Sequence, residues 1–215
     1  MHLKSREVAR TRGRPRKGTE RDEETLLDAA LDAFAEHGFD KASLRSIAGA
    51  ANVDVALIAY RYGSKLELWK AVIEAFSGET IAALASMQID PADVSSGRRL
   101  EIAIEQLMMV ARRKPQFALF IVKELVSTEQ SERANLLHQV LTEPMRQFFV
   151  PLIETAHREA GDRKFDANFA FFAALSAMAM LLATRKLIAR FASAAGDDDQ
   201  MHQQLGTVIR AILCP

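Results

Sequence analysis

The sequence predicts an all-α protein with a small N-terminal helical domain and a larger C-terminal helical bundle. Apolar residues recur at helical spacing along most of the 215 residues, and no segment alternates apolar and polar residues as strands do. Hydrophobic residues make up 49% of the chain, enough for a packed core and a subunit interface. We expect about nine helices from this spacing and from the breaks between the helical segments.

A first helix is predicted before Gly38, which acts as its stop signal. The apolar positions that give it helical spacing are Leu26, Leu27, Ala30, Leu31 and Phe34.

Two short helices are then predicted on either side of a turn at residues 51–53. Asn52 stands where the turn requires a left-handed backbone, a conformation that asparagine tolerates better than most residues. Ser43 and Asp54 are placed to cap the two helices by accepting hydrogen bonds from free backbone N–H groups. This arrangement is typical of a helix-turn-helix, whose second helix enters the DNA major groove. An ordinary helical hairpin with scattered cations is the alternative.

The remaining segments are also predicted to be helical. Ser64, followed three residues later by Glu67, predicts a capping box in which each side chain accepts a hydrogen bond from the other residue's backbone N–H. Proline at 144 and at 151 is expected to kink or split one long segment. The predicted helices after this cap cover about residues 66–86, 97–113, 115–126, 133–160, 167–194 and 199–213.

Residues 22–70 combine Ala30, Phe34 and Gly38-Phe39 with the run Tyr60-Arg61-Tyr62-Gly63-Ser64-Lys65. This order of residues resembles the TetR family of bacterial transcription regulators. Asn52 stands in place of glycine, Arg61 in place of histidine and Asp54 in place of a neutral residue. The resemblance implies a DNA-binding domain at 22–70 and a ligand-binding and dimerisation domain at 71–215. It is carried by Ala30, Phe34, Gly38, Phe39, Ile47, Ala48, Ala51, Val53, Ala56, Ile58, Tyr60, Arg61, Tyr62, Gly63, Ser64, Lys65 and Leu68, and its A-x-I-x-Y spacing is similar to the subgroup reading A-x-I-x-Y-H-F-G-S-K.

Charge is distributed unevenly along a chain whose formal net charge is zero. Residues 1–21 hold eight Lys or Arg against two Glu, a net +6, whereas residues 22–70 hold five cations against nine acids, a net −4. The arm contains Gly13-Arg14-Pro15-Arg16, which resembles an AT-hook that places arginines in a narrow minor groove. We therefore expect the arm to supply affinity for DNA; a solvated basic tail is the alternative. The residues expected to contact DNA there are Arg12, Arg14, Arg16 and Lys17.

Within the helix-turn-helix, the expected contacts divide into phosphate and base contacts. Ser43 and Leu44, at a helix N-terminus, are expected to anchor phosphate, and Arg45 to reach a phosphate or a base edge. The family geometry implies phosphate contacts for Tyr60, Arg61 and Lys65, while Tyr62 is expected to pack into the core. The same geometry turns four residues toward the groove: Asp54, Val55, Ala56 and Leu57.

The resemblance also implies a homodimer through the last two long helices, and a pocket for a small apolar or amphipathic effector. It implies a repressor that a ligand releases from a palindromic operator in double-stranded DNA. Residues expected to line the pocket are Met108, Ala111, Phe117, Phe120, Phe148, Phe172 and Met178, with Leu107, Val110 and Phe149 as further candidates.

The chain lacks the patterns expected of an enzyme. The five histidines have no metal-binding spacing, there is no glycine-rich phosphate loop, and the single cysteine, Cys214, is the penultimate residue. We expect no catalytic site, no metal and no cofactor. The longest apolar run, 169–183, is shorter than the about 20 residues that a bilayer requires, so a cytoplasmic protein is expected. An architectural DNA-binding protein that uses the arm without an effector remains the alternative function.

Overall fold

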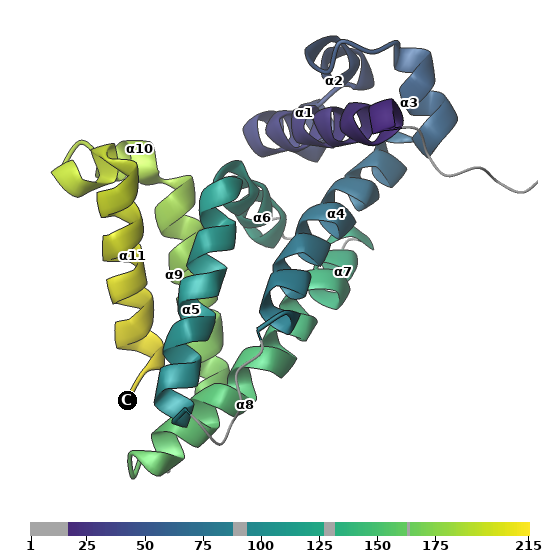
Figure 1. Ribbon diagram of the computed structural model, residues 1–215. Helices are drawn as coiled ribbons and strands as arrows, with labels where there is room; N and C mark the ends of the chain where they lie inside the picture. The colour runs from purple at the N-terminus through teal and green to yellow at the C-terminus, as the bar shows by residue number, and fades with distance from the viewer. Residues whose placement is uncertain (1–16, 88–93, 127–131, 163) are drawn as a thin grey trace, which may run out of the picture.

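The computed structural model describes residues 17–87, 94–126, 132–162 and 164–215, and within these ranges all regular structure is helical. A small three-helix unit lies at one end of the molecule, and a longer helical body extends away from it (Figure 1). Helix α4 runs from the first unit into the second. The predicted fold class is confirmed.

The N-terminal unit contains α1 (Lys17–Lys41), α2 (Leu44–Ala50) and α3 (Val55–Tyr62). Their shared core is almost completely shielded from solvent, so the short helices are stabilised mainly by burial of apolar surface. The core side chains of this unit are Leu26, Ala30, Leu31, Phe34, Ala35, Ala42, Ile47, Ala48, Ala51 and Ile58.

The backbone signals predicted in this unit are present. Gly38 has φ 76° and ψ 167°, which interrupts the helical geometry of α1 near its end. Asn52 has φ 53°, the left-handed value predicted for the turn between α2 and α3. The side chain of Ser43 accepts a hydrogen bond from Ser46 N at 3.0 Å, and that of Asp54 from Ala56 N at 2.7 Å, so both predicted caps are formed.

Helix α4 (Lys65–Ala85) begins with half of the predicted capping box. Ser64 Oγ accepts a hydrogen bond from Glu67 N at 3.1 Å. The reciprocal bond is absent from this described segment, because Ser64 N donates to Tyr62 O at 2.9 Å. The Glu67 carboxylate instead pairs with Lys70, 3.0 Å away on the next turn.

The C-terminal body contains α5 (Ser96–Arg113), α6 (Gln116–Val126), α7 (Glu132–Leu137), α8 (Glu143–Glu159), α9 (Ala167–Ala183), α10 (Arg185–Ile188) and α11 (Asp198–Leu213). A π-helical turn at His138–Thr142 joins α7 to α8, and a 3₁₀ turn at Ser193–Gly196 precedes α11. Helix α5 packs against α4, α8 and α11, while α6 lies between α1 and α9. No helix in the described ranges is long and apolar enough to span a bilayer.

Two predicted helix boundaries differ from the structure. The helix predicted to reach residue 194 ends at Ala183, where Thr184 leaves helical geometry at φ −100° and ψ 12° and its hydroxyl donates to Met180 O at 2.7 Å. Helix α8 begins at the predicted break near Pro144 but continues through Pro151. Pro151 lies on an exposed face, where water can replace the backbone donor that proline lacks.

Candidate DNA-binding surface and ligand cavity

One face of the N-terminal unit exposes the residues predicted to meet DNA. Arg45 on α2 and Val55 and Ala56 at the start of α3 are all exposed. Tyr60, one turn further along α3, is 88% exposed. A tyrosine side chain exposed to this degree makes few contacts within its own chain, so this surface is available to a partner.

The helix caps limit what two predicted contact residues can do. One Asp54 carboxylate oxygen is bound by Ala56 N at 2.7 Å, which leaves the second oxygen to accept a further hydrogen bond. Ser43 Oγ accepts from Ser46 N and also donates to Ser46 Oγ, each at 3.0 Å. Ser43 is therefore held in place before any phosphate approaches. Leu44 and Leu57 are half-buried, and Leu44 packs against the core.

The side chain of Tyr62 packs against the core and is half-buried, as predicted. Burial and the nearby Glu23 carboxylate raise the pKa of the Tyr62 phenol, whereas Arg61 lowers it. Arg61 is half-buried, and among the described residues its Nη1 has no hydrogen-bond partner.

Lys65 has a position within the unit that the sequence did not indicate. Its ammonium donates to Asp40 O at 3.1 Å and to Ala42 O at 3.2 Å, and it lies 4.6 Å from the centroid of the Phe39 ring. These contacts fasten the first turn of α4 to the end of α1. An ammonium has three donors, so one remains for a phosphate.

The predicted basic arm falls mostly outside the described residues. Arg12, Arg14 and Arg16 precede them, and Lys17 opens α1 without a described side chain.

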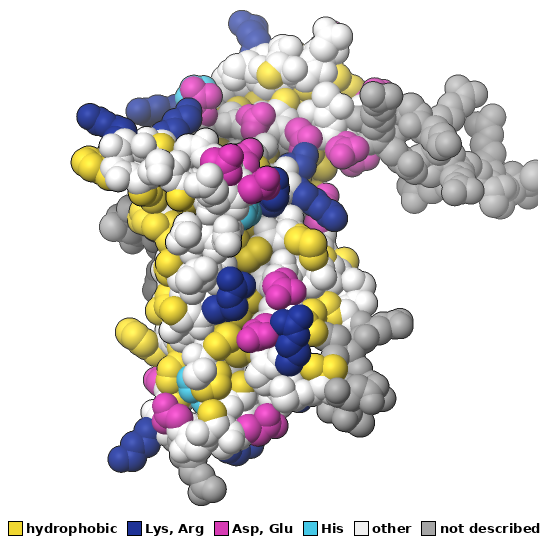
Figure 2. Space-filling model, turned by 60° about the vertical axis from the view of Figure 1, so that its left-hand side comes forward, with side chains coloured by type: hydrophobic (Ala, Val, Ile, Leu, Met, Phe, Trp, Pro, Cys, Tyr) yellow, Lys and Arg dark blue, Asp and Glu magenta, His cyan; other side chains and the backbone are white. Residues whose placement is uncertain are grey.

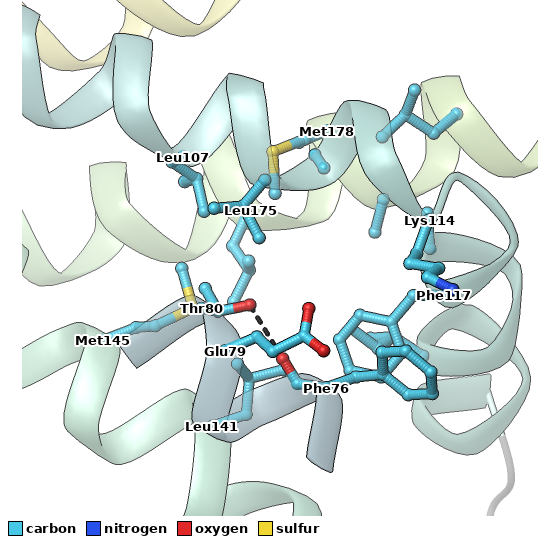
Figure 3. Close-up of a pocket in the computed structure, with 16 residues that line it drawn as sticks. Phe76, Glu79, Thr80, Leu107, Lys114, Phe117, Leu141, Met145, Leu175 and Met178 are labelled. Atoms are coloured by element: carbon cyan, nitrogen blue, oxygen red, sulfur yellow. Dashed lines mark hydrogen bonds between the residues drawn. The ribbon is translucent and has the colours of Figure 1, made fainter. Parts of the chain in front are cut away.

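A small cavity of about 60 Å³ lies in the C-terminal body (Figure 3). Its walls come from α4, α5, α6, π-helical residues, α8 and α9, and are almost entirely apolar. The rings of Phe76 and Phe117 lie side by side with centroids 5.8 Å apart. The charged residues in the lining are Glu79 and Lys114.

The structure places only some of the predicted pocket residues in the lining of this cavity. Ala111, Phe117 and Met178 line this cavity, as do Leu107 and Val110, whereas Phe149 lines a smaller neighbouring one. Four residues lie elsewhere. Helical spacing identifies the inner face of a helix but not which inner residues border a void, and on α9, which is apolar on nearly all sides, it does not identify the inner face either. The four residues are Met108, buried on α5; Phe120, buried against Trp69; Phe148, half-buried against Phe149; and Phe172, exposed on α9.

Helix α4 supplies cavity residues that were not predicted. Phe76, Glu79 and Thr80 project from its second half into the lining. Thr80 is buried and its hydroxyl donates to Phe76 O at 3.0 Å. No sequence signal distinguished the polar pair Glu79-Thr80, because the same segment also contains Lys70, Glu74 and Ser77, which lie outside the lining.

Ion pairs and hydrogen bonds join the cavity region to α1. Lys114, which lines the cavity, has its ammonium 2.5 Å from both carboxylate oxygens of Asp28. Lys123 on α6 donates to Glu36 O at 2.6 Å. Arg133 bridges the buried Glu124 carboxylate, at 3.0 Å, and the face of the Phe39 ring, at 4.2 Å.

Aromatic packing follows the same route. Phe117 stacks on Phe120 at a centroid distance of 5.8 Å. Phe120 contacts Trp69 at 5.5 Å and Phe34 at 6.5 Å. One continuous set of rings therefore leads from the cavity wall to the core of the N-terminal unit.

A separate apolar surface lies on α9 and α11. Phe169 is 76% exposed, and Phe172 and Met180 follow on the same face of α9. A second exposed row lies on α11, which packs beside α9, and consists of Thr207, Val208 and Ala211. Figure 2 brings this side of the molecule forward and shows apolar side chains exposed along one edge.

Comparisons with known proteins agree with this arrangement. Residues 26–72 match the family of bacterial regulatory proteins, tetR family. A TetR-like transcriptional regulator from Rhodococcus sp. RHA1 is similar over 89% of this chain and 95% of its own, with 20% identity and a TM-score of 0.61. No curated protein matches by sequence.

Two further solved structures have the same fold. A bacterial regulatory protein of the tetR family from Rhodococcus RHA1 is 17% identical, with a TM-score of 0.68 over 90% of this chain and 97% of that one. The transcriptional regulator FadR from Bacillus subtilis, solved in complex with stearoyl-CoA, is 15% identical, with a TM-score of 0.60 over 86% and 97%. Identities this low establish the fold and leave the ligand of this chain open.

The contacts of Lys65 generate a stability prediction. Lys65→Met should lower the free energy of unfolding by about 1–2 kcal/mol in the absence of DNA, because two charge-assisted hydrogen bonds and a cation–π contact are lost. Urea denaturation measures this change. Lys41→Met, at an exposed position near the end of α1, is the control and should change little. Equal stability of both variants would leave Lys65 with a role in DNA contact alone.

Proposed function

We propose that this chain, whose residues 26–72 match the tetR family of bacterial regulatory proteins, is a DNA-binding repressor that binds a palindromic operator as a homodimer. A small-molecule effector bound in the C-terminal body releases it. The observation that carries the first half of this proposal is the exposed face of α2 and α3, with Tyr60 almost fully accessible.

The residues on this face suit a major groove. Val55 and Ala56 offer methyl groups that can meet thymine methyls, and the free Asp54 oxygen can accept from cytosine N4. Tyr60 and Arg45 can donate to phosphate oxygens, which fixes the register of α3 on the duplex. Leu44 and Leu57, being half-buried, contribute mainly to packing of the two helices.

The exposed apolar rows on α9 and α11 support the homodimer. Two such adjacent helices can pair with their symmetry mates, and a two-fold axis then relates two copies of α3. Paired recognition helices read two half-sites about one helical turn apart, which explains why the operator is expected to be palindromic.

The cavity and its ties to α1 support release by an effector. A cavity of about 60 Å³ is well below the roughly 300–1,000 Å³ of typical ligand pockets, so a ligand must move the lining side chains. Lys114 and Phe117 belong to that lining and also to the contacts that hold α1 and its neighbours. A ligand that shifts them changes the position of the DNA-binding unit and thereby favours a state with lower affinity.

Selection from a random duplex library followed by footprinting tests operator binding. We expect a protected palindrome that survives a large excess of competitor DNA, with half-sites about 10 base pairs apart. Tyr60→Ala should weaken this binding about tenfold, the loss expected for one hydrogen bond to a charged phosphate. Phe191→Ala is a matched control, since Phe191 is 84% exposed but lies outside the helix-turn-helix. Uniform protection with a steep salt dependence would instead favour an architectural protein without an operator.

Removal of the basic arm provides a separate test. Deleting residues 1–16 leaves α1 intact and removes six Lys or Arg against one Glu. The operator affinity should fall, and the slope of log K against log salt should become shallower by about one for each arm cation that contacts a phosphate. Replacing Arg12, Arg14 and Arg16 by Gln keeps the arm length and should reproduce most of this loss. An unchanged slope would show that the arm is only a solvated tail.

The dimer surface is tested with two methionines in different places. Met180→Glu puts a charge in the exposed row of α9 and should shift the mass measured by light scattering from dimer toward monomer, because an unpaired charge in an apolar interface is costly. Met109→Glu is the matched control, since Met109 is equally exposed but lies on α5. A dimer that persists in the Met180 variant, or is lost only in the Met109 variant, places the interface elsewhere.

A further inference from the structure

The cavity carries one charge without a partner. Glu79, an exposed residue of α4, lines the cavity, and its carboxylate extends toward Phe117 (Figure 3). Across the described part of the chain, no cation lies within ion-pair distance of this carboxylate. Glu79 also lines a neighbouring surface hollow, so it stands where the cavity opens to solvent.

Lys114, the cation in the same lining, is already engaged. Both carboxylate oxygens of Asp28 lie 2.5 Å from its ammonium, and the Phe76 ring centroid lies 5.5 Å away. An anionic ligand would have to share this ammonium with the Asp28 carboxylate, which already accepts two of its hydrogen bonds. It would also approach the Glu79 carboxylate, which repels it.

The remaining wall favours an apolar ligand with a positive group. Phe76 and Phe117 lie beside Glu79 with their ring centroids 5.8 Å apart, and they offer aromatic surface to the apolar part of a ligand. Beyond them the lining is aliphatic, and Thr80 offers little because its hydroxyl is committed to Phe76 O.

We propose that the cavity binds an apolar organic cation whose charge is neutralised by Glu79, and that this cation is the effector class of the protein. The proposal rests on the proposed function in treating the cavity as the effector site. The apolar part of the ligand lies against Phe76 and Phe117, and the positive group faces the opening.

The neighbouring cavity shows where room for a larger ligand comes from. Leu107, Met145, Leu175 and Met178 line both the main cavity and a second one of about 20 Å³. Two of these four side chains are methionines, which are unbranched and adapt their shape readily. Rotation of Met145 and Met178 joins the two spaces and admits a ligand longer than the main cavity.

Binding is tested on the full-length protein, without DNA, by titration calorimetry with three probes of similar bulk. Phenyltrimethylammonium is the cation, tert-butylbenzene is its neutral isostere, and 4-tert-butylbenzoate is the anion. The cation should bind about tenfold or more tightly than either of the others, the difference that one charge-assisted contact makes.

Variants then locate the charge that is responsible. Glu79→Gln should remove the preference for the cation and leave the affinity for the neutral isostere unchanged. Glu74→Gln, exposed on the same helix but outside the cavity lining, should behave as the parent protein. Thermal melts of both variants show that they are folded. Tightest binding by the anion, lost in Lys114→Met, would overturn the proposal, as would a cation affinity that Glu79→Gln does not change.

The outcome is separable from that of the proposed function. A cation that binds through Glu79 but leaves operator affinity unchanged would preserve the ligand site and refute ligand-controlled release. Release from the operator by a ligand of another charge, with no binding of the cation, would refute the ligand class and preserve the regulator.

Discussion

Phe120 joins the two parts of this protein into one packed core. It projects from α6, contacts Trp69 on α4 at a centroid distance of 5.5 Å and reaches Phe34 on α1 at 6.5 Å. All three rings are buried. Since packed interiors transmit displacements instead of absorbing them, α6 cannot shift without repacking the helices that support the helix-turn-helix. The cavity wall meets this cluster directly through Phe117.

An acidic residue of α1 also forms an ion pair with the C-terminal body in the folded chain. From the sequence alone, the net charge of −4 in residues 22–70 is expected to weaken the affinity of this unit for DNA. In the structure the Asp28 carboxylate is paired with Lys114, which belongs to the C-terminal body. Part of the negative charge on α1 therefore holds the two parts together, on the side of α1 that faces the body.

Local backbone features could be predicted because they depend on few residues. Asn52 in the left-handed turn, Gly38 at the end of α1 and Asp54 as a cap each follow from their own stereochemistry or from one neighbour. The contacts of Lys65 with α1 and the membership of the cavity lining depend on how helices distant in sequence meet. Periodicity identified the buried face of α5 but not that of α9, where the predicted Phe172 is exposed, and it did not reveal that α4 completes the cavity with Phe76 and Glu79.

Helix α4 continues without a break through the boundary predicted at residue 70. Three side chains of α4 next to this boundary are fully buried: Trp69 and, one turn later, Val72 and Ile73. Trp69 packs against Phe120 on α6 of the body. A hybrid regulator assembled by joining this helix-turn-helix at residue 70 to the body of another protein would place unmatched side chains on both sides of one core. Under the function proposed above, exchange of DNA specificity is therefore better attempted by transplanting the exposed residues of α2 and α3 than by exchanging whole domains.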